Sequence, residues 1–179
     1  MKTYICTCGT SIITKRGINI DRIQHQPLSA WDDNSNDIEN SKDITLEALE
    51  GIRLPKDLDE TSAEIKSLVK MGVMSDDNII LIASDTVDGK LSAELVKGFL
   101  VKRSVCRNVD IKIISGLQAK NGKTFQNNGL KNLLNFLLNL EHGNFILNPT
   151  GGFKSVVPYL SLIGMLFNKP VKVCIPNFL

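Results

Sequence analysis

Predicted strands that alternate with helical patterns limit the fold of this chain more than any other feature. After a β-rich start at residues 4–8, a continuous apolar run lies at 78–83, and further runs typical of strands lie at 109–114, 145–147 and 171–175. Strands that are apolar on both faces belong to parallel sheets, because helices cover such sheets on both sides. The pattern therefore predicts an α/β protein with a mainly parallel sheet.

Segments with helical spacing of apolar residues lie between these runs. They cover residues 62–72, 89–103, 125–140 and 152–167, and the first of them begins at a hydroxyl residue that can cap it. A helix between successive strands predicts crossover connections that cover both faces of the sheet. We therefore expect a Rossmann-like, doubly wound fold that forms a single domain over all 179 residues.

One stretch interrupts this regular pattern. Between Trp31 and Ser41 the residues are mostly Asp, Asn and Ser, and the hydrophobic periodicity is weak. Such a composition buries too little apolar surface to order itself well. We predict a loop, a mobile polar insertion, at about residues 28–44.

The composition disfavours several classes of function. The net charge of +2 is too small for a protein that coats nucleic acid, so no large nucleic-acid partner is expected. No apolar stretch is long enough to cross a bilayer, so we expect no membrane partner and a cytoplasmic location.

The four cysteines lack the spacing of a zinc site or a thioredoxin motif and are expected to be reduced and buried. His25 and His142 are isolated in the sequence, so neither is given a role.

Small and polar residues directly follow the predicted strands. In open parallel sheets a ligand binds beyond the carboxyl ends of the strands, so these are the candidate binding residues. They are Gly9, Thr10, Ser11, Ser84, Asp85, Thr86, Gln118, Asn148, Thr150, Gly151, Gly152 and Lys154. The set has no histidine and one carboxylate, so neither a metal site nor a His-centred nucleophilic triad is expected. Each hydroxyl could equally cap a helix or close a turn, and Asp85 could cap the helix that begins near Gly89.

The turn after the predicted strand at 145–147, residues 148–155, is the best candidate for an anion site. Gly151 and Gly152 allow the backbone to approach a ligand, and the helix expected next offers unpaired N–H groups. Lys154 adds a positive charge in the first turn of that helix, where the helix dipole disfavours one, which indicates an anion nearby. The chain has neither G-x-G-x-x-G nor G-x-x-x-x-G-K-[ST], so dinucleotide enzymes and P-loop NTPases are disfavoured and no cofactor is expected.

Four strand-end motifs, in this order, resemble the CRISPR-associated Rossmann fold, or CARF, domain. The motifs are Gly9-Thr10-Ser11, Ser84-Asp85-Thr86 with Gly89 and Ala93-Glu94, Gly116-Leu117-Gln118 with Phe125 and Gly129-Leu130, and Asn148-Pro149-Thr150-Gly151-Gly152-Phe153-Lys154. The chain is most similar to the branch of type III CRISPR sensors and ring nucleases, over nearly its whole length. The resemblance implies a homodimer that binds a cyclic oligoadenylate, with cyclic tetra-adenylate as the expected ring, across its two-fold axis.

The resemblance also implies roles for individual residues. Thr150, Gly151, Gly152 and Lys154 correspond to the phosphate-binding turn, and Ser11 and Lys154 match the residues linked to cleavage in ring-cleaving relatives. An RNA ring carries its own nucleophile, the 2′-hydroxyl, so cleavage needs no metal. Ser11 would orient either that hydroxyl or a phosphate oxygen. We expect slow turnover, because no general base is at hand, to linear oligoadenylates with 2′,3′-cyclic phosphate ends.

Three functions remain open at this point. The first is a stand-alone ring nuclease that switches off type III CRISPR signalling. The second is a non-catalytic CARF sensor domain of an ancillary effector whose effector domain is missing from this chain. The sequence ends at Leu179, directly after the last predicted strand, which favours the enzyme over the sensor. The third is an unrelated nucleotide-binding α/β protein.

Overall fold

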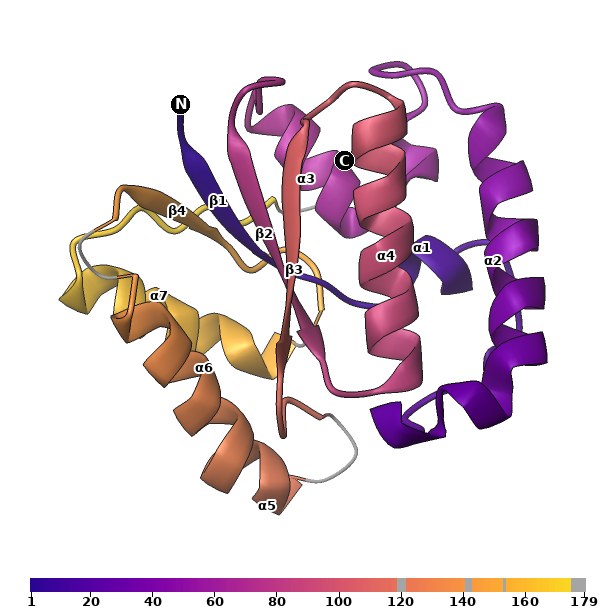
Figure 1. The fold of residues 1–179 in the computed structure, drawn as a ribbon. Helices are drawn as coiled ribbons and strands as arrows, with labels where there is room; N and C mark the ends of the chain where they lie inside the picture. Colours follow the sequence, from indigo (N-terminus) through magenta and orange to yellow (C-terminus); the bar gives the residue numbers. More distant parts are fainter. Residues whose placement is uncertain (119–121, 141–142, 153, 175–179) are drawn as a thin grey trace, which may run out of the picture.

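A sheet of four parallel strands forms the centre of the molecule (Figure 1). The computed structural model describes residues 1–118, 122–140, 143–152 and 154–174. The strands are β1 (Thr3–Thr7), β2 (Asn78–Ser84), β3 (Asn108–Ile114) and β4 (Phe145–Asn148), in the spatial order β3-β2-β1-β4. The chain adds β2 and β3 on one side of β1 and then places β4 on the other side. The topological switch point therefore lies between β1 and β4, and the predicted doubly wound α/β fold is confirmed.

Helices cover both faces of this sheet. They are α1 (Ser11–Thr14), α2 (Ser35–Glu50), α3 (Ala63–Lys70), α4 (Val87–Lys102), α5 (Gly122–Thr124), α6 (Leu130–Leu138) and α7 (Val157–Leu166). Figure 1 shows α1 to α4 on one side of the sheet and α5 to α7 on the other. Two apolar cores follow from this arrangement, because successive strand residues point to opposite faces. In β1, for example, Tyr4 and Cys6 join the first core and Ile5 joins the second.

The predicted loop at residues 28–44 is helical, so that part of the prediction is wrong. The turns η1 (Leu28–Ala30) and η2 (Asp32–Asn34) lead directly into α2. One stripe of α2 is buried, formed by Ile38, Ser41, Thr45 and Leu49 at spacings of three and four residues. Two of these four residues are polar, so the stripe is hidden in the hydrophobic pattern. The helix forms because this stripe packs beside α4, and packing contributes more to helix stability than composition does.

The other differences lie in the C-terminal half. The helix predicted at 125–140 begins with a π turn, η4 (Phe125–Gly129), before α6. The last predicted strand is reduced to a single parallel bridge between Val171 and Leu147, and its final residue, Ile175, lies outside the described residues. Backbone hydrogen bonds from Leu147 N to Pro170 O and from Lys172 N to Leu147 O hold this segment beside β4.

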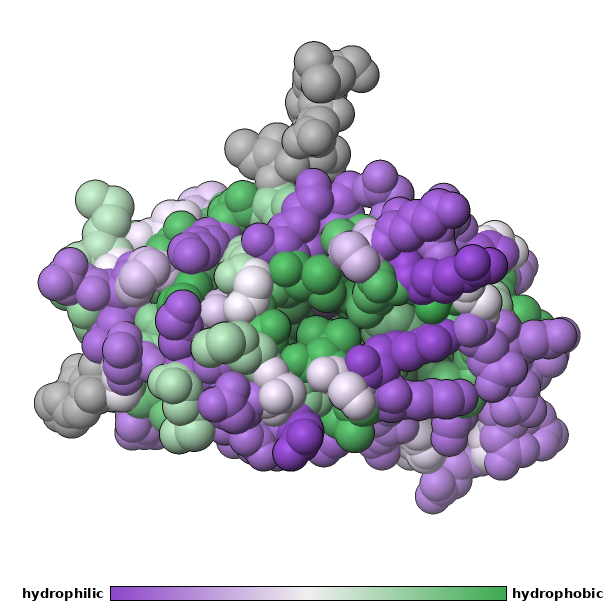
Figure 2. All heavy atoms as spheres, turned by 90° about the horizontal axis from the view of Figure 1, so that it is seen from above, coloured by the Kyte–Doolittle hydropathy of each residue, from purple (hydrophilic) through white to green (hydrophobic). Residues whose placement is uncertain are grey.

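The strands all begin at one end of the sheet and finish at the other (Figure 1). Viewed from above, at the end where the strands begin, apolar side chains gather toward the middle of the surface and hydrophilic ones surround them (Figure 2). The predicted binding residues lie at the other end, after the strands. No helix in the described part of the chain is both long and apolar enough to span a membrane.

Candidate functional site

The turns after β1 and β4 touch each other at two glycines. A Cβ on Gly9 would lie 2.8 Å from both N and Cα of Gly152, so no side chain fits there unless the backbone moves. Gly152 has a φ of +75°, in the left-handed region that favours glycine. The hydroxyl of Thr7 donates to the carbonyl oxygen of Gly151. Two of the predicted binding segments therefore form one continuous surface at the switch point between β1 and β4.

Asn148 supports this surface from below. Its side chain is fully buried and its Oδ1 accepts from Oγ1 of Thr150 at 2.6 Å. Its Nδ2 donates to Oγ of Ser67 at 2.8 Å and to Sγ of Cys6 at 3.2 Å. The hydroxyl of Thr150 also accepts from the backbone N–H of Cys174 at 2.9 Å. Both predicted binding residues are thus committed to holding the turn after β4.

The side chains after β2 are likewise bonded to the protein. Oγ of Ser84 and Oγ1 of Thr86 lie 2.7 Å apart. Thr86 is the N-cap of α4, because its hydroxyl accepts from Gly89 N at 3.3 Å. The alternative in which Asp85 caps this helix is therefore wrong. Asp85 instead joins the β2 turn to the β3 turn: Oδ2 accepts from Gly116 N at 3.0 Å and Oδ1 accepts from Nε2 of Gln118 at 3.0 Å.

A cavity of about 190 Å³ opens between the turns after β1 and β2. It is lined by Cys8, Gly9, Thr10, Gln24, His25, Ser84, Thr86, Asp88, Gly89, Gln118 and Gly152. His25 enters this lining from a segment that crosses the start of α4, where its own N–H donates to Oδ1 of Asp88 at 3.1 Å. Its φ is +60°, an uncommon value for a residue with a side chain. The sequence predicts no role for His25, because no residue close to it in the chain signals this position.

A second cavity, of about 550 Å³, lies beside the switch point and is rich in lysine. It is lined by Ser11, Lys15, Ala63, Lys66, Pro149, Thr150, Gly152, Lys154, Val157, Val173 and Cys174. Ser11 and Lys154 both line this cavity, although they are 143 residues apart in the sequence. The cavity therefore combines a hydroxyl, a glycine turn and three ammonium groups, a set suited to an anionic ligand.

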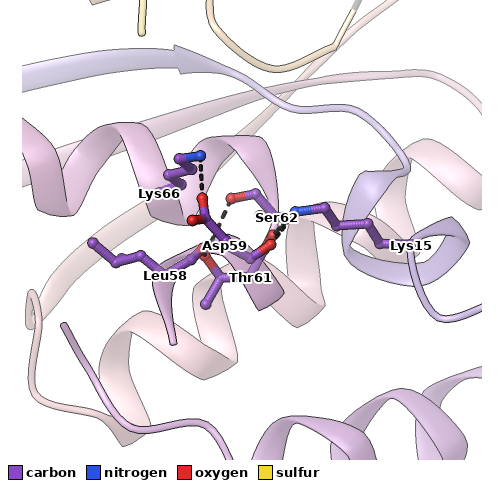
Figure 3. A network of polar contacts seen from close by, with 6 residues as sticks. All are labelled: Lys15, Leu58, Asp59, Thr61, Ser62 and Lys66. Carbon is purple, nitrogen blue, oxygen red and sulfur yellow. Dashed lines mark hydrogen bonds and ion pairs between the residues drawn. The ribbon is translucent and has the colours of Figure 1, made fainter. Parts of the chain in front are cut away.

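Two of the three lysines already have partners on the segment before α3 (Figure 3). Lys15 donates to the carbonyl oxygens of Asp59 and Thr61, the latter at 2.9 Å. Lys66 forms an ion pair with the carboxylate of Asp59. The hydrogen bond from Lys66 holds the pKa of Asp59 below its ordinary value, and it raises the pKa of Lys66. Both ammonium groups are thereby held by the segment before α3, and both residues line the cavity.

Lys154 differs from the other two lysines. Its side chain is exposed, and its ammonium group has no hydrogen bond or ion pair with any residue that the structure describes. It also lies in a 3₁₀ turn, η5 (Lys154–Val156), that precedes α7. The prediction that the glycine turn leads directly into the first turn of an α-helix is therefore wrong, while the exposed cation beside Gly152 remains. Residue 153 lies outside the described part of the chain.

Glu64 lies beneath the surface formed by the β1 and β4 turns, a position that the sequence did not predict. It is fully buried in the first turn of α3. Its Oε1 accepts from Gly9 N at 2.7 Å, and its Oε2 accepts from Oγ of Ser11 at 3.2 Å. Burial, and then the charge of Glu64, raises the pKa of Cys6 and of Cys8. The signal available in the sequence was Ser62 followed by an acidic residue in a first helical turn, which indicates a helix start and nothing about the strand ends.

Metal ligands do not gather in the described residues. No group of three or more His, Cys, Asp or Glu side chains there could hold a metal ion. The hydrogen-bonding and charged groups at the carboxyl edge are instead hydroxyls, amides, lysines and single carboxylates. Such a set binds and orients an anion through ammonium groups and hydrogen bonds.

Comparison with known proteins adds one family. A family model described as CRISPR-associated protein (Cas_APE2256) matches residues 59–174. The matched segment contains Glu64, the strands β2 to β4 and Lys154, and it begins after Ser11. A search of curated proteins finds no match to the chain.

Proposed function

The chain belongs to the CRISPR-associated Cas_APE2256 family, and on that premise we propose that it binds a cyclic oligoadenylate and cleaves it. The expected ring is cyclic tetra-adenylate, bound between two copies of the chain that form a CARF-type homodimer. Cleavage would switch off type III CRISPR signalling. One observation supports this proposal most: Ser11 and Lys154 line the same cavity, together with Lys15 and Lys66.

The phosphates of the ring require positive charge, and the cavity provides it in two forms. The ammonium group of Lys154 has no partner among the described residues and is therefore available to a phosphoryl oxygen. Lys15 adds positive potential, because it donates only to carbonyl oxygens of the segment at residues 59–61, whereas the charge of Lys66 is offset by its ion pair with Asp59. The chain's small net charge of +2 makes this local concentration of lysines the relevant attraction.

The chemical step is an in-line transesterification in which the ligand supplies the nucleophile. The 2′-hydroxyl gives up its proton, which ends in the solvent, as its oxygen forms a bond to the adjacent phosphorus. The bond between phosphorus and the 5′ oxygen breaks, and that oxygen takes a proton from water. The products are a 2′,3′-cyclic phosphate and a 5′-hydroxyl on a linear oligoadenylate. Ser11 would hold the reacting groups in line, and Lys154 would stabilise the charge on the phosphoryl oxygens.

Two-fold symmetry supports a dimeric complex with a ring of even size. A ring with two-fold symmetry offers each subunit the same phosphates, so one modest site is used twice. In a homodimer, each copy would contribute one Ser11 and one Lys154. Light scattering with and without ligand should therefore give the mass of two chains and one ring in the complex.

Calorimetry against rings of three, four and six adenylates, followed by product analysis, tests the proposal. We expect tightest binding of cyclic tetra-adenylate and slow cleavage in the presence of EDTA. Lys154→Ala and Ser11→Ala should each lower the cleavage rate at least about tenfold, the effect of losing one positioned contact. Lys102→Ala is the matched control, because Lys102 pairs with Glu50 at the other end of the sheet.

Each outcome separates one function from another. Binding without cleavage over hours would identify the protein as a non-catalytic sensor domain. No binding to any ring would overturn the proposal entirely and would favour an unrelated nucleotide-binding protein. Cleavage at the parental rate by Lys154→Ala would remove that residue from the mechanism.

A further inference from the structure

Glu64 is a fully buried acidic residue whose carboxyl group accepts a hydrogen bond from the hydroxyl of Ser11. It is placed there by α3, whose first turn points at the turn after β1. The N-cap Ser62 begins this helix by accepting from Ile65 N at 3.3 Å. Ser67, one turn later, donates to the backbone carbonyl oxygen of Glu64 at 2.9 Å and accepts from Asn148. The start of α3 is thus fixed to the end of β4.

A buried carboxylate needs compensation, and Glu64 obtains it from neutral donors. The amide of Gly9 and the hydroxyl of Ser11 each donate to one of its oxygens. No Lys or Arg of the described residues lies within ion-pair distance of it. Its position in the first turn of α3 adds the favourable end of the helix dipole. A carboxylate held without a cation, next to a candidate ligand-binding hydroxyl, is a candidate for a functional role.

The hydrogen bonds of Ser11 decide which role its hydroxyl can play. A serine hydroxyl has one proton to donate and two lone pairs that accept. The proton of Ser11 is donated to Oε2 of Glu64 at 3.2 Å, and one lone pair accepts from Ala63 N at 3.2 Å. One lone pair remains. Ser11 can therefore accept a hydrogen bond from a ligand, but it has no proton left for a phosphate oxygen.

We propose that Glu64 is a positioning residue that fixes Ser11 as a hydrogen-bond acceptor for the ligand's nucleophilic 2′-hydroxyl. This inference rests on the proposed function and deepens it. A phosphate oxygen only accepts hydrogen bonds, whereas a ribose hydroxyl also donates one. With its proton committed to Glu64, Ser11 recognises the ribose hydroxyl and holds that oxygen in place for attack. Of the two roles left open by the sequence, orientation of the hydroxyl is thereby selected.

Glu64→Gln tests this role, because it keeps the shape of the side chain and changes one acceptor into a donor. The amide oxygen of the substituted side chain can still accept from Gly9 N, while its NH₂ group now faces Ser11 as a donor. Ser11 would then accept from both residue 64 and Ala63 N, and its own proton would turn toward the ligand. The substitution therefore reverses the polarity of Ser11 without removing the residue.

The readout is the preference for a ribose ring over a 2′-fluoro ring, because fluorine can accept a hydrogen bond but cannot donate one. The parent protein, in which Ser11 accepts, should bind cyclic tetra-adenylate about tenfold more tightly than its 2′-fluoro analogue, the worth of one good hydrogen bond. Glu64→Gln and Ser11→Ala should each reduce this preference strongly, and the double variant should lose no more than either single variant. Glu47→Gln, which changes an exposed glutamate on α2, should leave it unchanged. Where the protein cleaves, kcat should fall in parallel with the preference.

The outcomes separate this inference from the proposed function. A parent that binds no ring overturns the proposed function. A parent that prefers the ribose ring while folded Glu64→Gln keeps the full preference overturns only the role of Glu64. If Glu64→Gln does not fold, as judged by circular dichroism, Ser11→Ala decides the question. An unchanged preference in Ser11→Ala then overturns the inference, and a lost one supports it.

Discussion

The carboxyl group of Glu64 occupies the space in which a side chain on residue 151 would have to lie. A Cβ built on Gly151 would stand 2.0 Å from Oε1 of Glu64 and 2.4 Å from its Cδ. The φ of Gly151 is not positive, so the backbone conformation of this residue does not require glycine. The packing of this residue against Glu64 of α3 requires glycine instead. This contact ties the glycine turn after β4 to the buried carboxylate beneath Ser11.

Gly151→Ala should therefore destabilise the protein and displace Glu64. We expect a loss of about 1–3 kcal/mol in the free energy of unfolding, the usual cost of overpacking a filled site. Urea denaturation measures it. Gly51→Ala is the matched control, because Gly51 has an ordinary φ of −73° and nothing within 4 Å of an added Cβ. Equal stability of the two variants would contradict the contact between Gly151 and Glu64.

Asp59→Asn should tighten ring binding, because it frees an ammonium group of a residue that lines the lysine-rich cavity. Lys66 is paired with Asp59 in the protein alone, and a phosphate must compete with that carboxylate. An exposed ion pair is worth little, so the gain should be about two- to fivefold in Kd. Calorimetry at two salt concentrations measures it, and Lys66→Met should weaken binding and flatten its salt dependence.

The control for this prediction is Glu50→Gln, which frees Lys102 from a similar exposed pair far from the cavity. It should leave the Kd of the ring unchanged. If both substitutions tighten binding equally, the effect comes from net charge alone, and the lysine-rich cavity has no special part in it.

The buried thiols should make the protein less stable in alkaline solution. Burial raises the pKa of Cys6, Cys8 and Cys106 in the folded protein. In the unfolded chain these thiols lose their protons above about pH 8.5, while the folded state keeps them. The unfolded state then binds fewer protons, so stability is complete below that pH and falls as pH rises. Urea midpoints at about pH 7.5 and about pH 9.5, on either side of the unfolded pKa, should show this fall, and it should be smaller in Cys8→Ala.

Alkylation gives an independent check on the same thiols. Thiolates react and thiols do not, so Cys6 and Cys8 should resist iodoacetamide at about pH 8 until urea unfolds the protein. Cys174 is only half-buried and should react first. Rapid modification of Cys6 or Cys8 in the folded protein would contradict their burial.

Ser104→Gly should stabilise the C-terminal end of α4. Ser104 has a φ of +54°, and the bonds from Val105 N to Leu100 O and from Ser104 N to Val101 O form a Schellman motif. Glycine adopts this conformation without a Cβ clash, so we expect a gain of about 1 kcal/mol in the free energy of unfolding. Thermal melting measures it. Ser29→Gly, in the helical turn η1, should have the opposite sign.

Some elements could be predicted because their signals are local. The runs at residues 78–83 and 109–114 became β2 and β3 with shifts of at most one residue, since short runs rich in isoleucine are typical of strands. By contrast, residues 35–44 of α2 were predicted as a loop, because the buried stripe of this helix includes Ser41 and Thr45, which look like surface residues in a sequence. Only the neighbouring α4 makes that stripe a buried one.

The candidate site likewise has features that the sequence predicts and features that only the folded chain shows. Because the strands are parallel, the order of amino acids was enough to predict that the residues after them meet at one edge, Ser11 and Lys154 among them. What lies against those residues could be seen only in the folded chain: Glu64 beneath Ser11, and Lys15 and Lys66 in the lining of the shared cavity. A strand end is encoded by adjacent residues, whereas the position of α3 depends on packing and on hydrogen bonds that span more than fifty residues of chain.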